Sequence, residues 1–308
     1  MSNNVEDLSA VDFLLFMDNP ESSDTIRQEY HIIKQNRRKS YQESDDEPDN
    51  KWCRDLLCRF FCCIKKEEEY SKANIIDCYD LYSREQKYIC VSDPQVEDCE
   101  KFWKLAWYHE VTTIVNISHE KEGESYRYWS PNEGNEMEYG KFRVKTLIVI
   151  KRHRFISTVL QLSDHKNFER LIWHYHYTAW PTDNNEVDPL MFLSFVCSLN
   201  DTYACYQKKQ PLGWTLGAIL VHCNDSSSSS AVYCILDNCV TQFKGTGTVS
   251  VANTFQKMQR RARSIKFDAD DYNFCYQAIR VYVLGEMGMN QEYLNERELA
   301  RFDTLWSF

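Results

Sequence analysis

Apolar residues recur at helical spacing in several parts of the chain. Near its start, VDFLLFM (11–17) and TIRQEYHIIKQ (25–35) repeat apolar side chains every three or four residues, and Ser22, Ser23 or Asp24 can cap the second segment. The later segments with a helical pattern are VEDCEKFWKLAWYHE (96–110), PLMFLSFVCSLNDTYACYQ (189–207), AVYCILDNCVTQF (231–243), ANTFQKMQRRARSI (252–265) and DDYNFCYQAIRVYVL (270–284).

Runs rich in β-branched and aromatic residues lie between these segments and predict strands. The expected strand regions are YICV (88–91), TTIVNI (112–117), FRVKTLIVIKRHRFISTVLQL (142–162), ERLIWHYHYTAW (169–180) and GAILVHC (217–223). Strands mixed with helices in this way indicate an α/β domain.

The chain divides into four expected parts. Residues 1–34 form a helical extension, and the charged stretch QNRRKSYQESDDEPDN (35–50) predicts an exposed connector. A main domain covers residues 51–290, and residues 291–308 form a tail.

Composition narrows the class of protein. The 308 residues carry a net charge of -10, which argues against nucleic acid as the main partner. The 13 cysteines include no CxxC pair or zinc-finger spacing, so we expect no metal and no other cofactor. With no secretory signal and no apolar run long enough to span a membrane, we expect a cytosolic protein with reduced thiols.

The stretch VHCNDSSSSSAVYCILDNCV (221–240) carries the candidate chemistry. A serine tract alone is typical of a linker, but this one lies between a buried strand and a helix. Strand, short loop and helix N-terminus can offer converging backbone N–H groups to an anion, although a plain strand-to-helix connection has the same pattern. The helix is expected to gather one apolar face from Ala231, Cys234, Ile235, Cys239 and Val240.

His-Cys followed by five residues and a fixed position resembles the His-Cys-x5-Arg-Ser/Thr signature of protein tyrosine phosphatases. Other segments resemble that family in order and spacing: EKFWKLAWYHEVTTIVNIS (100–118), YRYWSPNEG (126–134), YGKFRV (139–144), YHYTAWPT (175–182) and FQKMQRRARSIKFDADDYNFCYQAIRVYV (255–283). The length and the LSAVDFLLF start are most similar to tyrosine phosphatases carried by bracoviruses of parasitoid wasps. The resemblance implies a highly twisted mixed sheet flanked by helices.

Within this resemblance, Cys223 stands at the nucleophile position and His222 precedes it, whereas the arginine position is Ser229. Serine cannot make the bidentate contact that arginine makes with a phosphoryl group. Asp225 adds a carboxylate where a phosphate would sit, and the loop lacks glycine. The expected binding positions are His222, Asn224, Asp225, Ser226, Ser227, Ser228 and Ser230, with Asp55 as a contact for a substrate backbone.

The other catalytic positions also depart from the family. The general-acid position is Thr182, whose hydroxyl is no acid near neutral pH, and Asp183 can replace it only if the loop shifts. Phe267 and Asp271 stand where two glutamines are expected. Trp52 falls in the segment of the phosphotyrosine-stacking tyrosine, where it is a stacking face or an ordinary packed aromatic.

These losses predict a pseudophosphatase that binds an unidentified protein, with phosphotyrosine-containing proteins as one candidate class. The resemblance places it in the cytoplasm of a parasitised insect's cells, with an effect on immune signalling. The alternative is a weakly active phosphatase that uses Cys223. A membrane contact through acylated Cys58, Cys62 and Cys63 is a further alternative to simple core packing, and QRRARSIK (259–266) is expected to be a solvated helix face.

Overall fold

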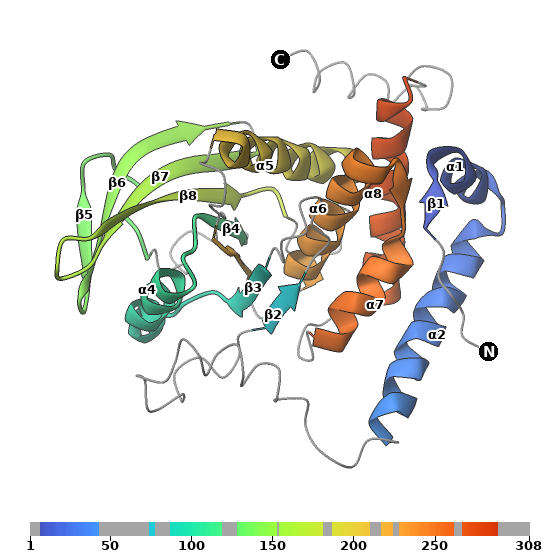
Figure 1. Cartoon of the computed structure of the whole chain (residues 1–308), viewed down its shortest axis with the longest axis horizontal. Helices are drawn as coiled ribbons and strands as arrows, with labels where there is room; N and C mark the ends of the chain where they lie inside the picture. Colours follow the sequence, from blue (N-terminus) through green and yellow to red (C-terminus); the bar gives the residue numbers. More distant parts are fainter. Residues whose placement is uncertain are drawn as a thin grey trace.

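A computed structural model gives the fold of the chain and describes residues 7–42, 74–77, 87–118, 128–152, 154–180, 187–209, 217–223, 228–261 and 267–288. Within these residues a mixed sheet runs across the molecule, with helices on both of its faces (Figure 1). The expected α/β class, with a twisted mixed sheet flanked by helices, is confirmed.

Eight of the described strands form this sheet in the order β2-β3-β9-β4-β8-β7-β6-β5. Strands β3, β9, β4 and β8 are parallel, and the pairs β2–β3, β8–β7, β7–β6 and β6–β5 are antiparallel. Their bounds are β2 Asn74–Asp77, β3 Lys87–Ser92, β4 Thr113–Ile117, β5 Glu136–Tyr139, β6 Phe142–Lys151, β7 Phe155–Ser163, β8 Glu169–Tyr177 and β9 Ile219–Cys223.

The main helices of the described chain are α4 to α8, preceded by the N-terminal pair α1 and α2. Their bounds are α1 Ala10–Asp18, α2 Ser22–Gln42, α4 Cys99–Tyr108 (after the 3-10 turn η1, Val96–Asp98), α5 Pro189–Lys209, α6 Ser228–Thr246, α7 Val251–Arg261 and α8 Ala269–Glu286. The expected helices and strands form close to where the sequence placed them, but the β-rich run 142–162 is two antiparallel strands, β6 and β7. Strands β2 and β5 were not expected. The expected boundary at residue 34 falls inside α2.

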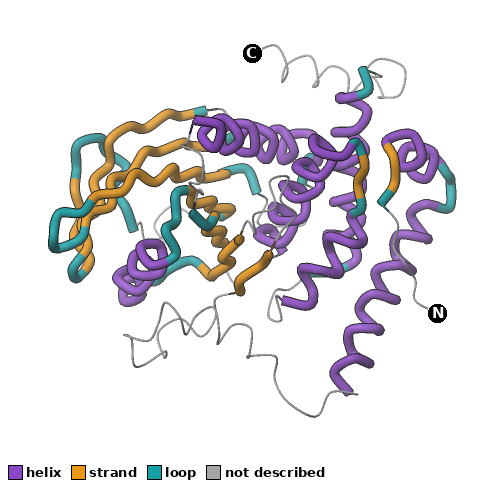
Figure 2. Tube along the Cα trace, viewed as in Figure 1, coloured by secondary structure: helices purple, strands orange, loops and turns teal. Residues whose placement is uncertain are grey.

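The sheet separates two hydrophobic cores. One core joins the sheet to α5, α6, α7 and α8, and the other packs α4, Tyr128 and Trp129 against the opposite face. In Figure 1 the N-terminal helices lie beside α7 and α8, at the far end of the molecule from β5 and β6. Figure 2 shows most of the strands at one end, with α4 beside them, and most of the helices at the other end, where the short strands β1 and β10 also lie.

The N-terminal pair is attached to this helical end by specific contacts. Two residues of the chain start, β1 (Leu8–Ser9), pair with β10 (Thr248–Val249) just before α7. The Tyr30 hydroxyl donates to the Phe267 carbonyl over 2.7 Å, and the Tyr30 ring stacks on Phe255. The extension predicted from the sequence is thus packed against the main domain.

Gly140 lies in the segment YGKFRV (139–144), and the structure shows why glycine stands at this position. It lies in the β5–β6 turn with φ of +58°, a conformation that favours glycine. A side chain there would also collide with the Glu100 carboxylate at the start of α4. The backbone conformation is the reason that this turn favours glycine, since the end of the flexible Glu100 side chain could move aside.

Candidate functional site

Cys223 is the last residue of β9, at the carboxyl end of the parallel strands. Its neighbours in the sheet are Ser92 of β3 and Ile117 of β4, and its side chain is buried. Ligand sites in open α/β sheets form at this end of the strands. Helix α6 begins five residues later, at Ser228.

Cys223, at the nucleophile position, contacts Ser230, one of the predicted binding residues. The Ser230 hydroxyl donates to the Cys223 sulfur over 2.9 Å. Ser230 is the Ser/Thr position of the signature, so the structure brings the two ends of that motif together.

Ser229, at the arginine position, is fully buried. The sequence from His222 to Ser230 contains neither lysine nor arginine. The described start of α6 therefore offers hydroxyl groups and the positive end of a helix dipole, without a guanidinium group. Such a site cannot clamp an oxyanion with two parallel charged contacts, and the Ser230 hydroxyl already donates to Cys223.

Asp271, at one of the two glutamine positions, faces the same helix end. It lies in the first turn of α8, and its carboxyl group accepts a hydrogen bond from Ser228. Burial raises the pKa of Asp271 to about 6, although the backbone N–H of Asp268 and the Ser228 hydroxyl oppose the increase. A carboxyl group thus stands where the resemblance expects an amide.

Phe267, at the other glutamine position, has a different role. Its ring is buried against Phe255, with the ring centroids 4.9 Å apart, and against Tyr272. A phenyl ring in this core cannot orient a water molecule.

The general-acid segment packs against neighbouring helices at Trp180. Its ring packs on Phe192 of α5 and Phe274 of α8, with centroids 4.9 and 6.4 Å away. Thr182 and Asp183, which follow it, lie outside the described residues. The same is true of a larger set of predicted positions: Asn224, Asp225, Ser226, Ser227, Trp52, Asp55, Cys58, Cys62 and Cys63.

His222 begins a buried polar chain that sequence reasoning did not find. Its Nδ1 lies 2.5 Å from Asp93 Oδ1, and its Nε2 is hydrogen bonded to the Tyr128 hydroxyl. That hydroxyl also contacts His174 Nε2 at 2.7 Å. Both ring nitrogens of His222 therefore have polar partners, as expected for a buried histidine.

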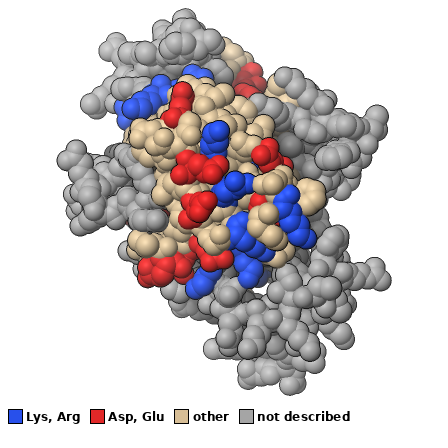
Figure 3. Space-filling view, turned by 90° about the vertical axis from the view of Figure 1, so that its left-hand side faces the viewer, with Lys and Arg blue, Asp and Glu red and all other residues tan. Residues whose placement is uncertain are grey.

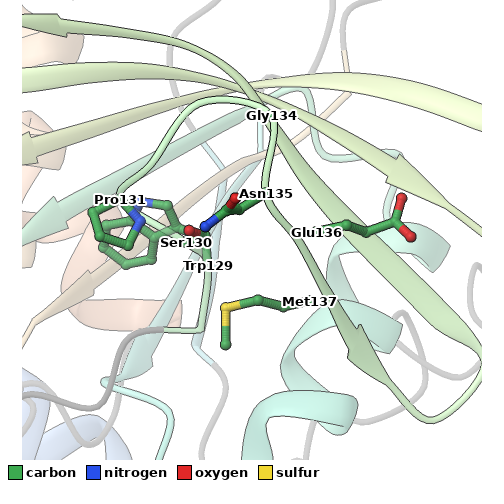
Figure 4. A pocket seen from close by; sticks show the side chains of 7 residues that line it. All are labelled: Trp129, Ser130, Pro131, Gly134, Asn135, Glu136 and Met137. Atoms are coloured by element: carbon green, nitrogen blue, oxygen red, sulfur yellow. The ribbon is translucent and has the colours of Figure 1, made fainter.

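Trp129 covers the far end of this chain. Its ring centroid lies 4.1 Å from that of His174, and a shallow surface hollow opens on its outer side. Figure 4 shows that the Asn135 side chain points toward Trp129 and Ser130, whereas Glu136 points away from them. The residues lining this hollow do not include Cys223 or the serines of α6, so we place the candidate site at α6 instead.

No helix in the described part of the chain combines the length and the apolar character needed to cross a membrane.

Comparison with known proteins agrees with this geometry. The sequence model of the family described as protein-tyrosine phosphatase matches residues 55–280. Three similar proteins come from Microplitis demolitor bracovirus (isolate Webb). "Probable tyrosine phosphatase protein J4" is 33% identical over 92% of this chain and 94% of its own, and "Probable tyrosine phosphatase protein J2" is 31% identical over 89% and 93%. "Tyrosine phosphatase-like protein J3" is 32% identical over 68% of this chain and 86% of its own.

The match spans the sheet, α4 to α7 and most of α8, and it includes the Cys223 end of β9 and the start of α6. Two of these relatives align over nearly their whole length. The chain belongs to the protein-tyrosine phosphatase family.

Proposed function

We propose that this protein is a pseudophosphatase, which acts by binding a protein of phosphotyrosine signalling rather than by removing phosphate. The observation that carries the proposal is Ser229, a fully buried, uncharged residue at the arginine position. Losing one transition-state contact of this kind costs on the order of 10²–10³-fold in rate, and a charged bidentate clamp is stronger than a single neutral donor.

The rest of the described site supports the same conclusion. Asp271 adds a carboxyl group beside Ser228, and a negative charge there opposes the binding of a phosphate dianion. Phe267 is packed in the core. Three departures therefore act in the same direction, while the strands and helices that hold the site are retained.

The kind of partner follows from the family and from charge. The net charge of -10 disfavours nucleic acid, and Figure 3 shows acidic and basic side chains interleaved on the described residues of the β5–β6 end. A nucleic-acid site needs a continuous basic surface. The relatives come from a bracovirus, so we propose a protein partner in the cytoplasm of host insect cells. We propose further that the protein affects immune signalling there.

A weakly active phosphatase is the second candidate. It is favoured by the Ser230–Cys223 contact and by the place of Cys223 before a helix N-terminus, since both features suit a nucleophilic thiol. This candidate requires turnover that depends on the Cys223 sulfur.

One pair of proteins separates the two candidates. Wild type and Cys223→Ser are assayed side by side on p-nitrophenyl phosphate and on a phosphotyrosine peptide. We expect the same background rate for both. A wild-type rate more than tenfold above that of Cys223→Ser would establish the active phosphatase and reject the pseudophosphatase.

The binding role has its own test in cultured insect immune cells. Both proteins are expressed at equal levels, and tyrosine phosphorylation of the cell extract is compared with that of untransfected cells. We expect equal changes with wild type and Cys223→Ser, because binding does not need the thiol. A change with wild type alone would indicate catalysis, and no change with either would reject a role in this signalling.

A further inference from the structure

Asp93 contacts both residues of the His-Cys pair. It directly follows β3, and its backbone N–H donates to the Cys223 carbonyl over 3.1 Å. Its carboxylate lies 2.5 Å from His222 Nδ1. The His222 side chain is 1% exposed and that of Asp93 is 20% exposed, so the contact is largely shielded from water.

The hydrogen bonds beyond His222 continue inward through Tyr128 to His174. His174 is fully buried, and its Nδ1 has no hydrogen-bond partner among the residues that the structure describes. Burial lowers the pKa of His174 well below its usual value, with the nearby His222 and His176 rings acting in the same direction. His174 is therefore neutral and carries one ring proton.

The position of that proton sets the direction of the whole chain. A buried N–H without a partner is rarer and more costly than an unused lone pair, so the His174 proton belongs on Nε2, facing Tyr128. Tyr128 then accepts from His174 and donates to His222 Nε2. This leaves the His222 proton on Nδ1, where it points at Asp93.

All the donors in the chain thus run in one direction and end on the carboxylate of Asp93. An ionised carboxylate only accepts hydrogen bonds, so it is the group that such a chain needs at its end. The charge also strengthens the last hydrogen bond, in an environment where an unmade one is costly.

We propose that Asp93 is the positioning residue of the His222–Cys223 pair, holding His222 as the Nδ1–H tautomer and fixing the end of β9 at Cys223. This role goes beyond the proposed function, because it holds whether or not Cys223 turns over a substrate.

The test measures the tautomer directly. The full-length protein is labelled with ¹⁵N-histidine, and the ring nitrogens of His222 are assigned by comparison with His222→Gln. We expect the Nδ1–H tautomer in wild type. In Asp93→Ala we expect the Nε2–H form to become populated and exchange of the ring proton with water to quicken at least tenfold.

Asp93→Asn is the conservative variant. Its amide oxygen can still accept from Nδ1–H without the charge, so we expect the Nδ1–H tautomer with faster proton exchange than in wild type. If Asp93→Ala does not fold, the proposal is tested on Asp93→Asn alone. Asp164→Ala is the matched control, since Asp164 is another buried carboxylate that accepts two backbone N–H bonds, from Lys166 and Phe168.

We expect Asp164→Ala to lower stability without moving the His222 signals. An Nε2–H tautomer in wild-type protein would overturn the proposal. Unchanged His222 signals in Asp93→Asn and, if it folds, in Asp93→Ala would overturn it as well.

Discussion

The Ser230 hydroxyl donates a hydrogen bond to the sulfur of Cys223 over 2.9 Å, between two buried side chains. Because Ser230 lies in the first turn of α6 and Cys223 ends β9, the contact links the strand to the helix across the signature loop. It gives a first prediction.

Ser230→Ala removes the donor and leaves the buried sulfur without it, so the free energy of unfolding should fall by about 1 kcal/mol. Ser230→Thr keeps the hydroxyl and should cost less. Urea denaturation measures both. Ser198→Ala on the exposed side of α5 is the control and should change stability by less than about 0.5 kcal/mol. Equal stabilities for Ser230→Ala and wild type would show that the contact contributes nothing.

A second prediction concerns Asp237, a buried carboxyl group in the middle of α6. The Tyr88 hydroxyl donates to its Oδ2, and Asn200 Nδ2 donates to its Oδ1 over 2.9 Å. Burial raises the pKa of Asp237, while these two donors oppose the increase. Tyr88→Phe should therefore destabilise the protein by about 1–3 kcal/mol, because one oxygen loses a donor it cannot replace with water.

A double-mutant cycle tests this explanation. With Asp237→Asn in place no charge is left without its donor, so adding Tyr88→Phe should cost clearly less than it does in wild type. Tyr108→Phe is the control, since the Tyr108 side chain is exposed and its hydroxyl has only a 3.5 Å contact with Lys141. Additive costs in the cycle would contradict the direct coupling of Tyr88 to Asp237.

The sequence predicted the strand at 217–223 and the following helix because their apolar periods differ clearly. It underestimated the helix in two ways. α6 begins at Ser228, so three of the five serines belong to the helix rather than to the loop. The helix is also buried on almost every side, including Asp237 and Asn238, because α5 and α8 pack around it. The sequence pattern of one apolar helix face could not show this. Whether a polar residue is buried depends on its contacts with other parts of the chain, which the pattern does not contain.

Asp93 shows why part of the site could not be predicted. It stands in the short segment SDPQ, which reads as an ordinary turn, and its partner His222 lies 129 residues later. The parallel pairing of β3 with β9 brings the two together. Local periodicity carries no information about a contact made by neighbouring strands of a sheet. His222 and Cys223 were found because the signature places them side by side in the sequence.

A third prediction addresses the attachment of the N-terminal helices. The hydroxyls of Tyr272 and Tyr276 on α8 both donate to Glu29 Oε1 on α2, each over 2.6 Å. Hydrogen bonds to an ionised carboxylate are about twice as strong as neutral ones. Glu29→Gln keeps an acceptor and should cost about 1 kcal/mol, whereas Glu29→Ala should cost about 2–3 kcal/mol.

Guanidinium denaturation of these variants checks the order of the two costs. Glu21→Gln, just before α2 and exposed, is the matched control and should be close to neutral. The prediction is wrong if Glu29→Ala is as stable as wild type. It is also wrong if Glu29→Gln costs as much as Glu29→Ala. The stability cost of losing the charge could not then be separated from the cost of losing the hydrogen-bond acceptor.

A fourth prediction uses pH to test the contact between Asp271 and α6. The pKa of Asp271 is raised to about 6 in the folded protein, mainly by burial, from an ordinary value of 3.8. Between about pH 4 and pH 6 the folded state therefore holds a proton that the unfolded state has released. Stability falls as pH rises through this window, and the loss is complete above the folded pKa.

Asp271→Asn cannot ionise, so it avoids this loss while its side-chain oxygen can still cap α8. The stability of Asp271→Asn relative to wild type should increase between pH 4 and pH 7, by about 1–2 kcal/mol after allowance for partial solvent screening. Urea denaturation of both proteins at several pH values gives this difference. Other groups that titrate equally in the two proteins do not contribute to it. Asp270→Asn, at the exposed neighbouring position, should give a much flatter difference. If the Asp271→Asn difference does not change with pH, the carboxyl group is not buried against the start of α6, and its opposition to phosphate binding must be abandoned.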